Sequence, residues 1–390
     1  MSQYLLLGSR RFLPLFCTQF LGALNDNIYK NALVIFIAFT LADKTTINST
    51  ILVIMAGGLF ILPYFLFSAT AGQIADKYEK SMLIRRIKLA EILIMCLAVT
   101  GFVSQSVFIL MTILFLMGVQ STFFGPLKYG IVPQHLEFHE LTGGNGLIQM
   151  GTFLAILGGT IIGGVLIAIK GLGVFLVSIM VVVIAISGWF ASRHIPSASP
   201  ADDTLGIDWN IFRQTFRIVR YAISEKTVFI AMIAISWFWF IGATYLSLVP
   251  TYTRDVLMGN ELVATLLLTA FSIGIGAGSL LCETLSRKKI EPGLVPIGAF
   301  GLSLFALDLY LVGVPDIISS LDLTVLSPGI FLGYLLHWRI LLDLVCIGFF
   351  GGIYIVPLYA MIQHRSNPIY RSRVIAATNI LNALFMVISA

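Results

Sequence analysis

The chain has 390 residues, of which 58% are hydrophobic and 11% are charged, and its formal net charge is +5. A soluble globular domain carries about 25% charged residues, and the mean hydropathy of +0.96 excludes that class. The composition predicts an all-α polytopic membrane helix bundle. The four cysteines are scattered through apolar segments without metal-ligand spacing, so neither a metal site nor a cofactor is expected.

Apolar runs long enough to cross a bilayer, about 20 residues each, predict the membrane spans. They lie near 12–41, 49–75, 82–104, 107–125, 141–169, 172–192, 228–250, 262–285, 293–313, 335–362 and 374–390. Segment 314–334 is interrupted by prolines and aspartates, so it is expected to be a loop, in which a short piece could re-enter the membrane.

Lysine and arginine residues predict the orientation, because they gather in cytoplasmic loops. A cytoplasmic N-terminus places most of them on one side. The loop after the second span is then expected to hold Lys77, Lys80, Arg85, Arg86 and Lys88, and the fourth span is expected to end at Lys128. The opposite side holds only Lys44, Lys170, Arg254 and Arg339. This basic balance faces anionic lipid headgroups, so no nucleic acid is needed to explain it.

Six predicted spans precede a polar stretch and five follow it, so the chain is expected to have three regions. Residues 1–192 form an N-terminal six-helix bundle, 193–227 a cytoplasmic linker, and 228–390 an incomplete C-terminal bundle of about five helices. Because the last span is short for a hydrocarbon core of about 30 Å, the sequence is expected to be truncated, with its last helices cut or missing.

The linker contains a stripe of apolar residues at helical spacing. These residues are Trp209, Phe212, Phe216, Val219 and Ile223, and Arg213, Arg217 and Arg220 flank them. The pattern predicts an amphipathic helix in the cytoplasmic membrane interface. A solvated connector is the alternative.

The first span carries a polar break, Asn25-Asp26-Asn27, followed one turn later by Lys30. A carboxylate near the bilayer centre costs about 3 kcal/mol, so it is kept where it faces a protein interior or a water-filled cavity. Asp26 and Lys30 are four residues apart and share one helix face. They could form an internal ion pair, or they could meet the two charges of a zwitterionic headgroup.

The loop GQIADKYEKSMLIRR resembles the signature loop of the major facilitator superfamily, with Gly72, Asp76, Lys77 and Lys80 at matching positions. The resemblance implies a latch between this loop and neighbouring helix ends. Glu79 replaces the second glycine of the pattern, which puts the turn geometry in question. A weaker copy follows the eighth span and includes Gly278, Glu283, Arg287, Lys288 and Lys289.

Three further segments, TQFLGALNDNIYKNAL, FFGPLKYGIVPQHL and LTGGNGLIQMGTFLAILGGTIIGG, resemble the bacterial lysophospholipid transporter family. Within that family they resemble the branch that is fused to an acyltransferase and an acyl-carrier-protein synthetase. The resemblance implies the major facilitator superfamily fold, with two pseudo-symmetric six-helix halves. It also implies flipping of lysophospholipid, chiefly lysophosphatidylethanolamine, across the bacterial inner membrane for reacylation on the cytoplasmic side.

A zwitterionic headgroup needs both signs of charge in its site. Asp26 is expected to bind the ammonium group, and Lys30 or Lys128 the phosphate. Asn25, Asn27, Gln120 and Tyr129 are expected to support them. Glu91 either pairs with a basic residue or titrates. Relatives in the stand-alone branch carry a basic residue near GATYLSLVP, where this chain has Thr244, Tyr245 and Leu246.

Catalysis by this chain is not expected. None of the five histidines is followed by aspartate at the His-x4-Asp spacing of glycerolipid acyltransferases, so any chemistry would belong to a fused or separate partner. Two alternatives stay open. One is a proton- or cation-coupled carrier of small amphipathic solutes that uses Asp26, and the other is a non-transporting membrane anchor.

Overall fold

The computed structural model describes residues 3–41, 49–312 and 326–389. Nearly all of this part of the chain is helical. The long helices are α1 (Leu13–Phe36), α2 (Ser49–Lys77), α3 (Lys80–Val103), α4 (Val107–His135), α5 (Leu141–Ile167), α6 (Gly173–Ser192), α7 (Ile211–Ser224), α8 (Lys226–Asp255), α9 (Glu261–Leu285), α10 (Leu294–Val312), α12 (Leu335–Arg365) and α13 (Arg371–Ser389). Short helical turns are η1 (Gln3–Gly8), η2 (Ile37–Leu41), η4 (Phe138–Glu140), α11 (Pro328–Phe331) and η6 (Pro368–Tyr370).

Each predicted span corresponds to one long helix, and α7 corresponds to the predicted linker helix. Within the described residues, nine helices are long and apolar enough to cross a membrane. The two remaining long helices of the first half, α1 and α3, carry charged residues in their interiors, and both pack inside that half against α6. Most of the segment 314–334 lies outside the described residues, so the re-entrant piece stays a prediction.

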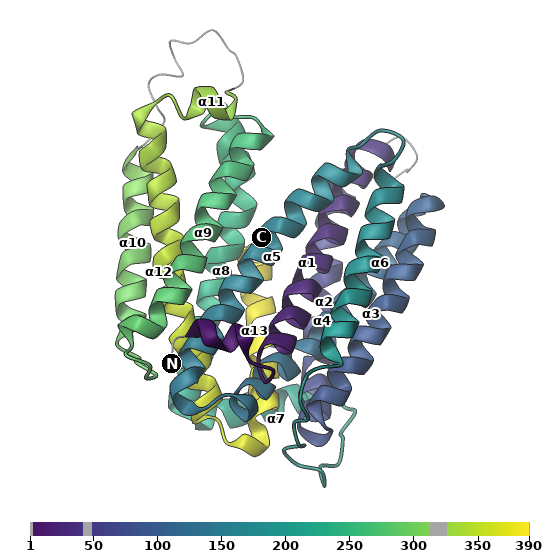
Figure 1. The fold of residues 1–390 in the computed structure, drawn as a ribbon, viewed down its shortest axis with the longest axis vertical. Coiled ribbons are helices and arrows are strands. Elements are labelled where there is room, and N and C mark those ends of the chain that lie inside the picture. Colours follow the sequence, from purple (N-terminus) through teal and green to yellow (C-terminus); the bar gives the residue numbers. More distant parts are fainter. Residues whose placement is uncertain (1–2, 42–48, 313–325, 390) are drawn as a thin grey trace.

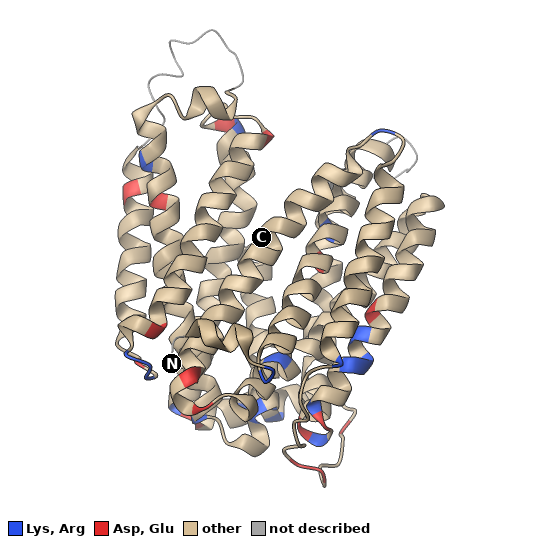
Figure 2. Ribbon diagram, viewed as in Figure 1, with Lys and Arg blue, Asp and Glu red and all other residues tan. Residues whose placement is uncertain are grey.

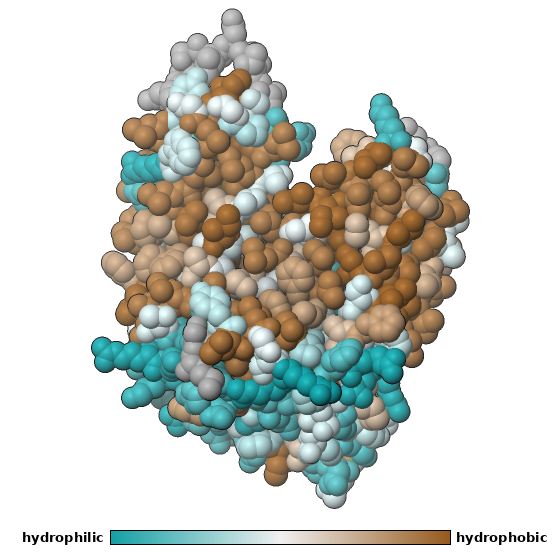
Figure 3. Space-filling view, viewed as in Figure 1, coloured by the Kyte–Doolittle hydropathy of each residue, from teal (hydrophilic) through white to brown (hydrophobic). Residues whose placement is uncertain are grey.

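The helices form two groups that diverge toward one end (Figure 1). Helices α1 to α6 make the first half, and α8, α9, α10, α12 and α13 make the second. The halves meet where α2 and α4 pack against α13 and where α5 packs against α9 and α12. Figure 2 shows most charged residues at the end where α7 lies. An apolar band crosses the middle of the face drawn in Figure 3, and this face is hollowed between the halves at the end opposite α7.

Asp76 joins the two halves at the end where α7 lies, which we call the latch end. Its carboxylate is fully buried and accepts three hydrogen bonds from the start of α13. The donors are Ser372 N at 3.1 Å, Arg373 N at 3.3 Å and Arg373 Nε at 2.9 Å. Gly72 makes this approach possible, because a Cβ there would lie 2.9 Å from the Arg373 Cα.

The other members of the predicted latch behave differently. Lys80 is buried and donates to the Ser199 carbonyl at 3.5 Å, whereas the Lys77 ammonium lies 5.8 Å from the ring centroid of Tyr78. In the weaker copy, the carboxylate of Glu283 accepts a hydrogen bond from Gln3 N at 3.0 Å. Arg287 is exposed, and Lys288 is half-buried. Among the described residues, no ion pair connects Arg287 or Lys288 to the first half.

Glu79 shows why the second glycine of the signature loop is not required here. Its φ is −60°, and it is the N-cap of α3, so its carboxylate accepts hydrogen bonds from Ser81 N and Met82 N at 3.0 and 2.6 Å. Ala198 N, in the linker, donates to the same carboxylate at 2.6 Å. Burial alone would raise the pKa of Glu79, but these hydrogen bonds outweigh it and hold the pKa below its usual value.

Candidate functional site

Asp26 and Lys30 lie on α1 and are both partly accessible, so neither is enclosed in packed protein. Ser121 Oγ, from α4, donates to Asp26 Oδ2 at 2.6 Å. The Lys30 ammonium lies 5.7 Å from the ring centroid of Phe60 on α2. The described residues form several ion pairs, but Asp26 and Lys30 do not pair with each other. Both charges are therefore available to a third group.

Lys88 does not lie in a cytoplasmic loop, and that prediction was wrong. It belongs to α3, its side chain is fully buried, and its Nζ lies 2.6 Å from Glu91 Oε2. The sequence allowed Glu91 either to pair or to titrate, and in the structure it pairs. Gly22 of α1 makes room for the ammonium group, because a Cβ there would lie 2.4 Å from Lys88 Nζ.

Two of the predicted site amides bind this ion pair. Asn25 Nδ2 donates to Glu91 Oε1 at 3.0 Å, and Gln120 Nε2 donates to Glu91 Oε2 at 2.9 Å. The Ser121 hydroxyl lies 3.2 Å from Gln120 Oε1, so polar contacts run without a break from Lys88 to Asp26. Buried carboxylates need such partners, because an unpaired one is costly in an apolar interior. Asn25 and Gln120 therefore stabilise the buried Glu91 carboxylate next to Asp26.

The remaining predicted residues lie elsewhere. Asn27 Nδ2 donates to the Ala23 carbonyl at 2.8 Å, and its Cβ packs where Gly159 lets α5 approach α1. Lys128 was expected at the end of its span, but α4 continues two turns farther, to His135. Its Nζ lies 4.5 Å from the ring centroid of Tyr129. Within the described part of the chain, no hydrogen bond or ion pair joins Lys128 to Asp26.

Tyr129 lies in the contact between the halves. Its ring stacks on that of Tyr359 from α12, with centroids 4.3 Å apart and planes 8° apart. Nearby, Asn145 Nδ2 donates to Gln363 Oε1 at 2.6 Å, and Gln363 Nε2 donates back to Asn145 Oδ1 at 3.1 Å. All four side chains are buried. Together with Asp76 they close the latch end.

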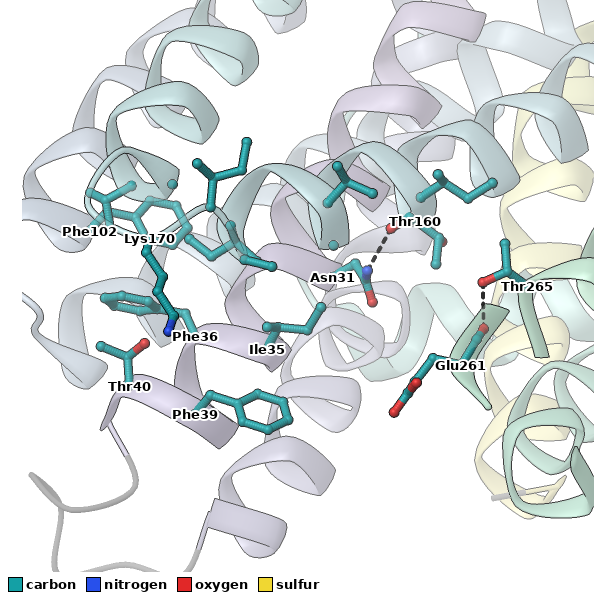
Figure 4. Close-up of a pocket in the computed structure, with 18 of the residues that line it drawn as sticks. Asn31, Ile35, Phe36, Phe39, Thr40, Phe102, Thr160, Lys170, Glu261 and Thr265 are labelled. Carbon is teal, nitrogen blue, oxygen red and sulfur yellow. Dashed lines mark hydrogen bonds between the residues drawn. The ribbon is translucent and has the colours of Figure 1, made fainter. Parts of the chain in front are cut away.

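A cavity of about 1190 Å³ opens at the other end, between α1, α5 and α9 (Figure 4). Its lining is mainly apolar, with Ile35, Phe36 and Phe39 on the side of α1. Asn31 lies at its wall and donates to the Thr160 carbonyl at 2.6 Å. Asp26 and Lys30 are not among the lining residues of this cavity, and they precede Asn31, the first lining residue on α1.

Two charges of opposite sign line the same cavity, Lys170 from the first half and Glu261 from the second. Neither was singled out from the sequence, because Lys170 follows a span and Glu261 begins one, where charges are ordinary. Ser121 was missed as well. In the sequence, only its position next to Gln120 could have indicated that Ser121 belongs to the site.

The Lys88–Glu91 pair gives a first test of this geometry. Replacing Glu91 with leucine is expected to destabilise the protein by about 3–5 kcal/mol, because Lys88 would be left buried and unpaired. The double replacement Lys88→Met, Glu91→Leu should recover most of that loss. Thermal unfolding in detergent measures both, and a double variant as unstable as Glu91→Leu alone would contradict the expectation.

Comparison with known proteins shows which family the chain belongs to. Residues 15–390 match the family model described as the Major Facilitator Superfamily. The chain is 27% identical to the lysophospholipid transporter LplT of Yersinia pestis (strain Pestoides F) over 364 residues, which cover 92% of this chain and 79% of the relative. LplT of Yersinia pseudotuberculosis (serotype O:3, strain YPIII) matches equally well.

Solved structures agree on the fold. The human organic anion transporter MFSD10 has a TM-score of 0.71 at 14% identity, with 97% of this chain and 91% of that chain covered. The proton:xylose symporter XylE has a TM-score of 0.66 at 12% identity, with 97% and 87% covered. The predicted fold class is therefore confirmed, and the chain belongs to the Major Facilitator Superfamily.

Proposed function

We propose that this chain flips lysophospholipid, chiefly lysophosphatidylethanolamine, across the bacterial inner membrane by alternating access. The observation that carries the proposal is the pair Asp26 and Lys30, which share one face of α1, are accessible and do not neutralise each other. A zwitterionic headgroup carries an ammonium and a phosphate, and this face offers a partner for each. The similarity to LplT supports the same substrate class.

The mainly apolar cavity, which Asn31, Ile35 and Phe36 line farther along α1, suits the acyl chain, because hydrocarbon in an apolar pocket avoids water. Lys170 and Glu261 at the cavity wall offer opposite charges to a headgroup that enters from the end opposite the latch. The state described here is closed at Asp76 and open at the cavity. Transport then requires the latch end to open while the cavity closes, as the halves rock about the site.

In this proposal the N-terminus is cytoplasmic, and reacylation is the task of an acyltransferase and acyl-carrier-protein synthetase, fused or separate. The substrate-binding residues would be Asp26 and Lys30, with Lys128 reached after a rearrangement. The latch would consist of Gly72, Asp76 and Lys80 with the start of α13.

Proteoliposomes test the proposal. Purified protein is reconstituted with a trace of headgroup-intact, fluorescent-chain lysophosphatidylethanolamine, and the outward appearance of the label is followed with an impermeant quencher. Faster inversion than in protein-free vesicles is expected, and unchanged inversion would refute the proposal. Soluble amphipathic cations serve as competitors. If they block inversion better than unlabelled lysophosphatidylethanolamine does, the cation-coupled carrier is the better description.

A further inference from the structure

Helix α7 is attached to the membrane-spanning bundle at both of its ends. At its start, Asp208 N donates to Gln73 Oε1 at 2.9 Å, and Gln73 Nε2 donates to the Asp208 carbonyl at 3.1 Å. Gln73 lies one turn before the end of α2. At its other end, α7 is separated from α8 by Glu225 alone, and the apolar part of α8 begins at Val228. Both ends of α7 therefore lie at the level where spans leave the membrane.

One face of α7 packs on the protein and the other does not. Gln214, Ile218 and Ala222 are buried, and α7 packs against α2, α8 and α13. The outward face carries large apolar side chains, with Phe212 86% and Phe216 70% exposed. Trp209, just before the helix, is 70% exposed. Such a face on a helix at the membrane boundary is typical of partial insertion between lipid headgroups.

Three arginines accompany this apolar face. Arg213, Arg217 and Arg220 are all exposed, and Arg213 has a single loose ion pair, with Asp208 at 3.6 Å. Guanidinium groups at this position complement the phosphates of anionic lipids, which attract basic segments at the cytoplasmic surface. The outward face of α7 thus combines apolar insertion with positive charge, and it fits an anionic bilayer surface better than an aqueous one.

The same helix contacts the latch by a second route. Tyr221 of α7 stacks on Tyr370, with ring centroids 4.5 Å apart, and the guanidinium of Arg373 lies 4.1 Å from the ring centroid of Tyr370. Arg373 is the residue that binds the buried carboxylate of Asp76. The linker adds direct bonds, since Ala201 N and Asp202 N donate to the Asp76 carbonyl at 2.8 and 3.0 Å. Helix α7 therefore contacts Arg373 through Tyr370, and the linker that precedes α7 binds the backbone of Asp76.

We propose that the outward face of α7 docks on anionic phospholipid, and that this docking stabilises the closed latch between Asp76 and α13. Lipid that holds α7 against the membrane also holds Tyr221 on Tyr370 and Asp208 on Gln73. Opening of the latch end must disturb these contacts, because α13 and α2 belong to different halves. Anionic lipid then favours the state that is open away from the latch, whichever substrate is carried.

Cysteine labelling in nanodiscs tests this. Ser372 is fully buried in the closed latch, so a Ser372→Cys variant, in a chain with its four native cysteines replaced, reports opening through its reaction with an impermeant maleimide. Each basic side chain near an anionic surface favours docking by about five-fold. We expect phosphatidylglycerol added to phosphatidylcholine discs to slow labelling by at least about five-fold. No lysophospholipid is present, so the result is independent of the proposed function.

The variant R213Q/R217Q/R220Q should label at the same rate in both kinds of disc. The matched control R10Q/R86Q/R365Q removes the same charge from exposed positions at the same end and should keep the lipid effect. A second measurement uses a chain whose sole tryptophan is Trp209, which brominated phosphatidylglycerol should quench. Absence of quenching, absence of a lipid effect in the parent chain, or persistence of that effect in the α7 variant would overturn the proposal.

Discussion

Replacing Asp26 with asparagine is expected to slow lysophospholipid inversion by about 10- to 100-fold, because a hydrogen bond to a charged group contributes about 1.5–3 kcal/mol. Asparagine keeps the size of the side chain, and its carbonyl oxygen can still accept the hydrogen bond that Ser121 Oγ donates to Asp26 at 2.6 Å. What it removes is the negative charge offered to the ammonium group. The initial rate of inversion in proteoliposomes measures the effect, and the melting temperature in detergent shows whether folding is intact.

Asp203→Asn is the matched control, because Asp203 is an exposed aspartate of the linker and its replacement removes the same charge. Its inversion rate should equal that of the parent chain. Lys30→Met should impair inversion as Asp26→Asn does, since the headgroup would lose its partner for the phosphate. Normal rates in both single variants would remove this face of α1 from the mechanism.

The sequence identified Asp26 because a carboxylate inside a long apolar run is conspicuous at any depth. It misplaced Lys88 for the opposite reason. A lysine within the first turns of a helix that follows a basic loop has the same local pattern whether it is exposed or buried. Only the approach of α1 at Gly22 and the amides of Asn25 and Gln120 bury it with Glu91. Contacts between helices distant in sequence cannot be read from either helix alone.

The latch shows the same limit. Gly72 and Asp76 were predicted from the resemblance of their loop, and the structure places both against the start of α13. Their partners, Ser372 and Arg373, are nearly 300 residues away in sequence, so no spacing rule could indicate them. Tyr129 was assigned to the substrate by resemblance, whereas its stacking on Tyr359 depends on how the two halves meet. The all-α membrane bundle needed only the apolar runs and could therefore be predicted, whereas the superfamily fold was predicted from the resemblance of its motifs.

Replacing Asp76 with alanine is expected to open the latch end. The carboxylate is fully buried and is the acceptor for two backbone amides and the Arg373 guanidinium, so its loss leaves a buried cation unpaired. Breaking a buried pair costs about 3–5 kcal/mol, and here the cost falls only on the state in which the halves are joined at this end. Labelling of Ser372→Cys by an impermeant maleimide should therefore accelerate by at least about ten-fold.

Asp76→Asn should give an intermediate rate, because its carbonyl can still accept from Ser372 N while the charge on Arg373 goes unmatched. Asp202→Ala is the control on the same arginine, since Asp202 lies 3.9 Å from Arg373 Nη2 and is partly exposed. Exposed ion pairs contribute about 0–1 kcal/mol, so this variant should label nearly as slowly as the parent chain. If Asp202→Ala opened the latch as far as Asp76→Ala, the guanidinium would be held chiefly by the linker, and the buried carboxylate would not be the element that joins the halves.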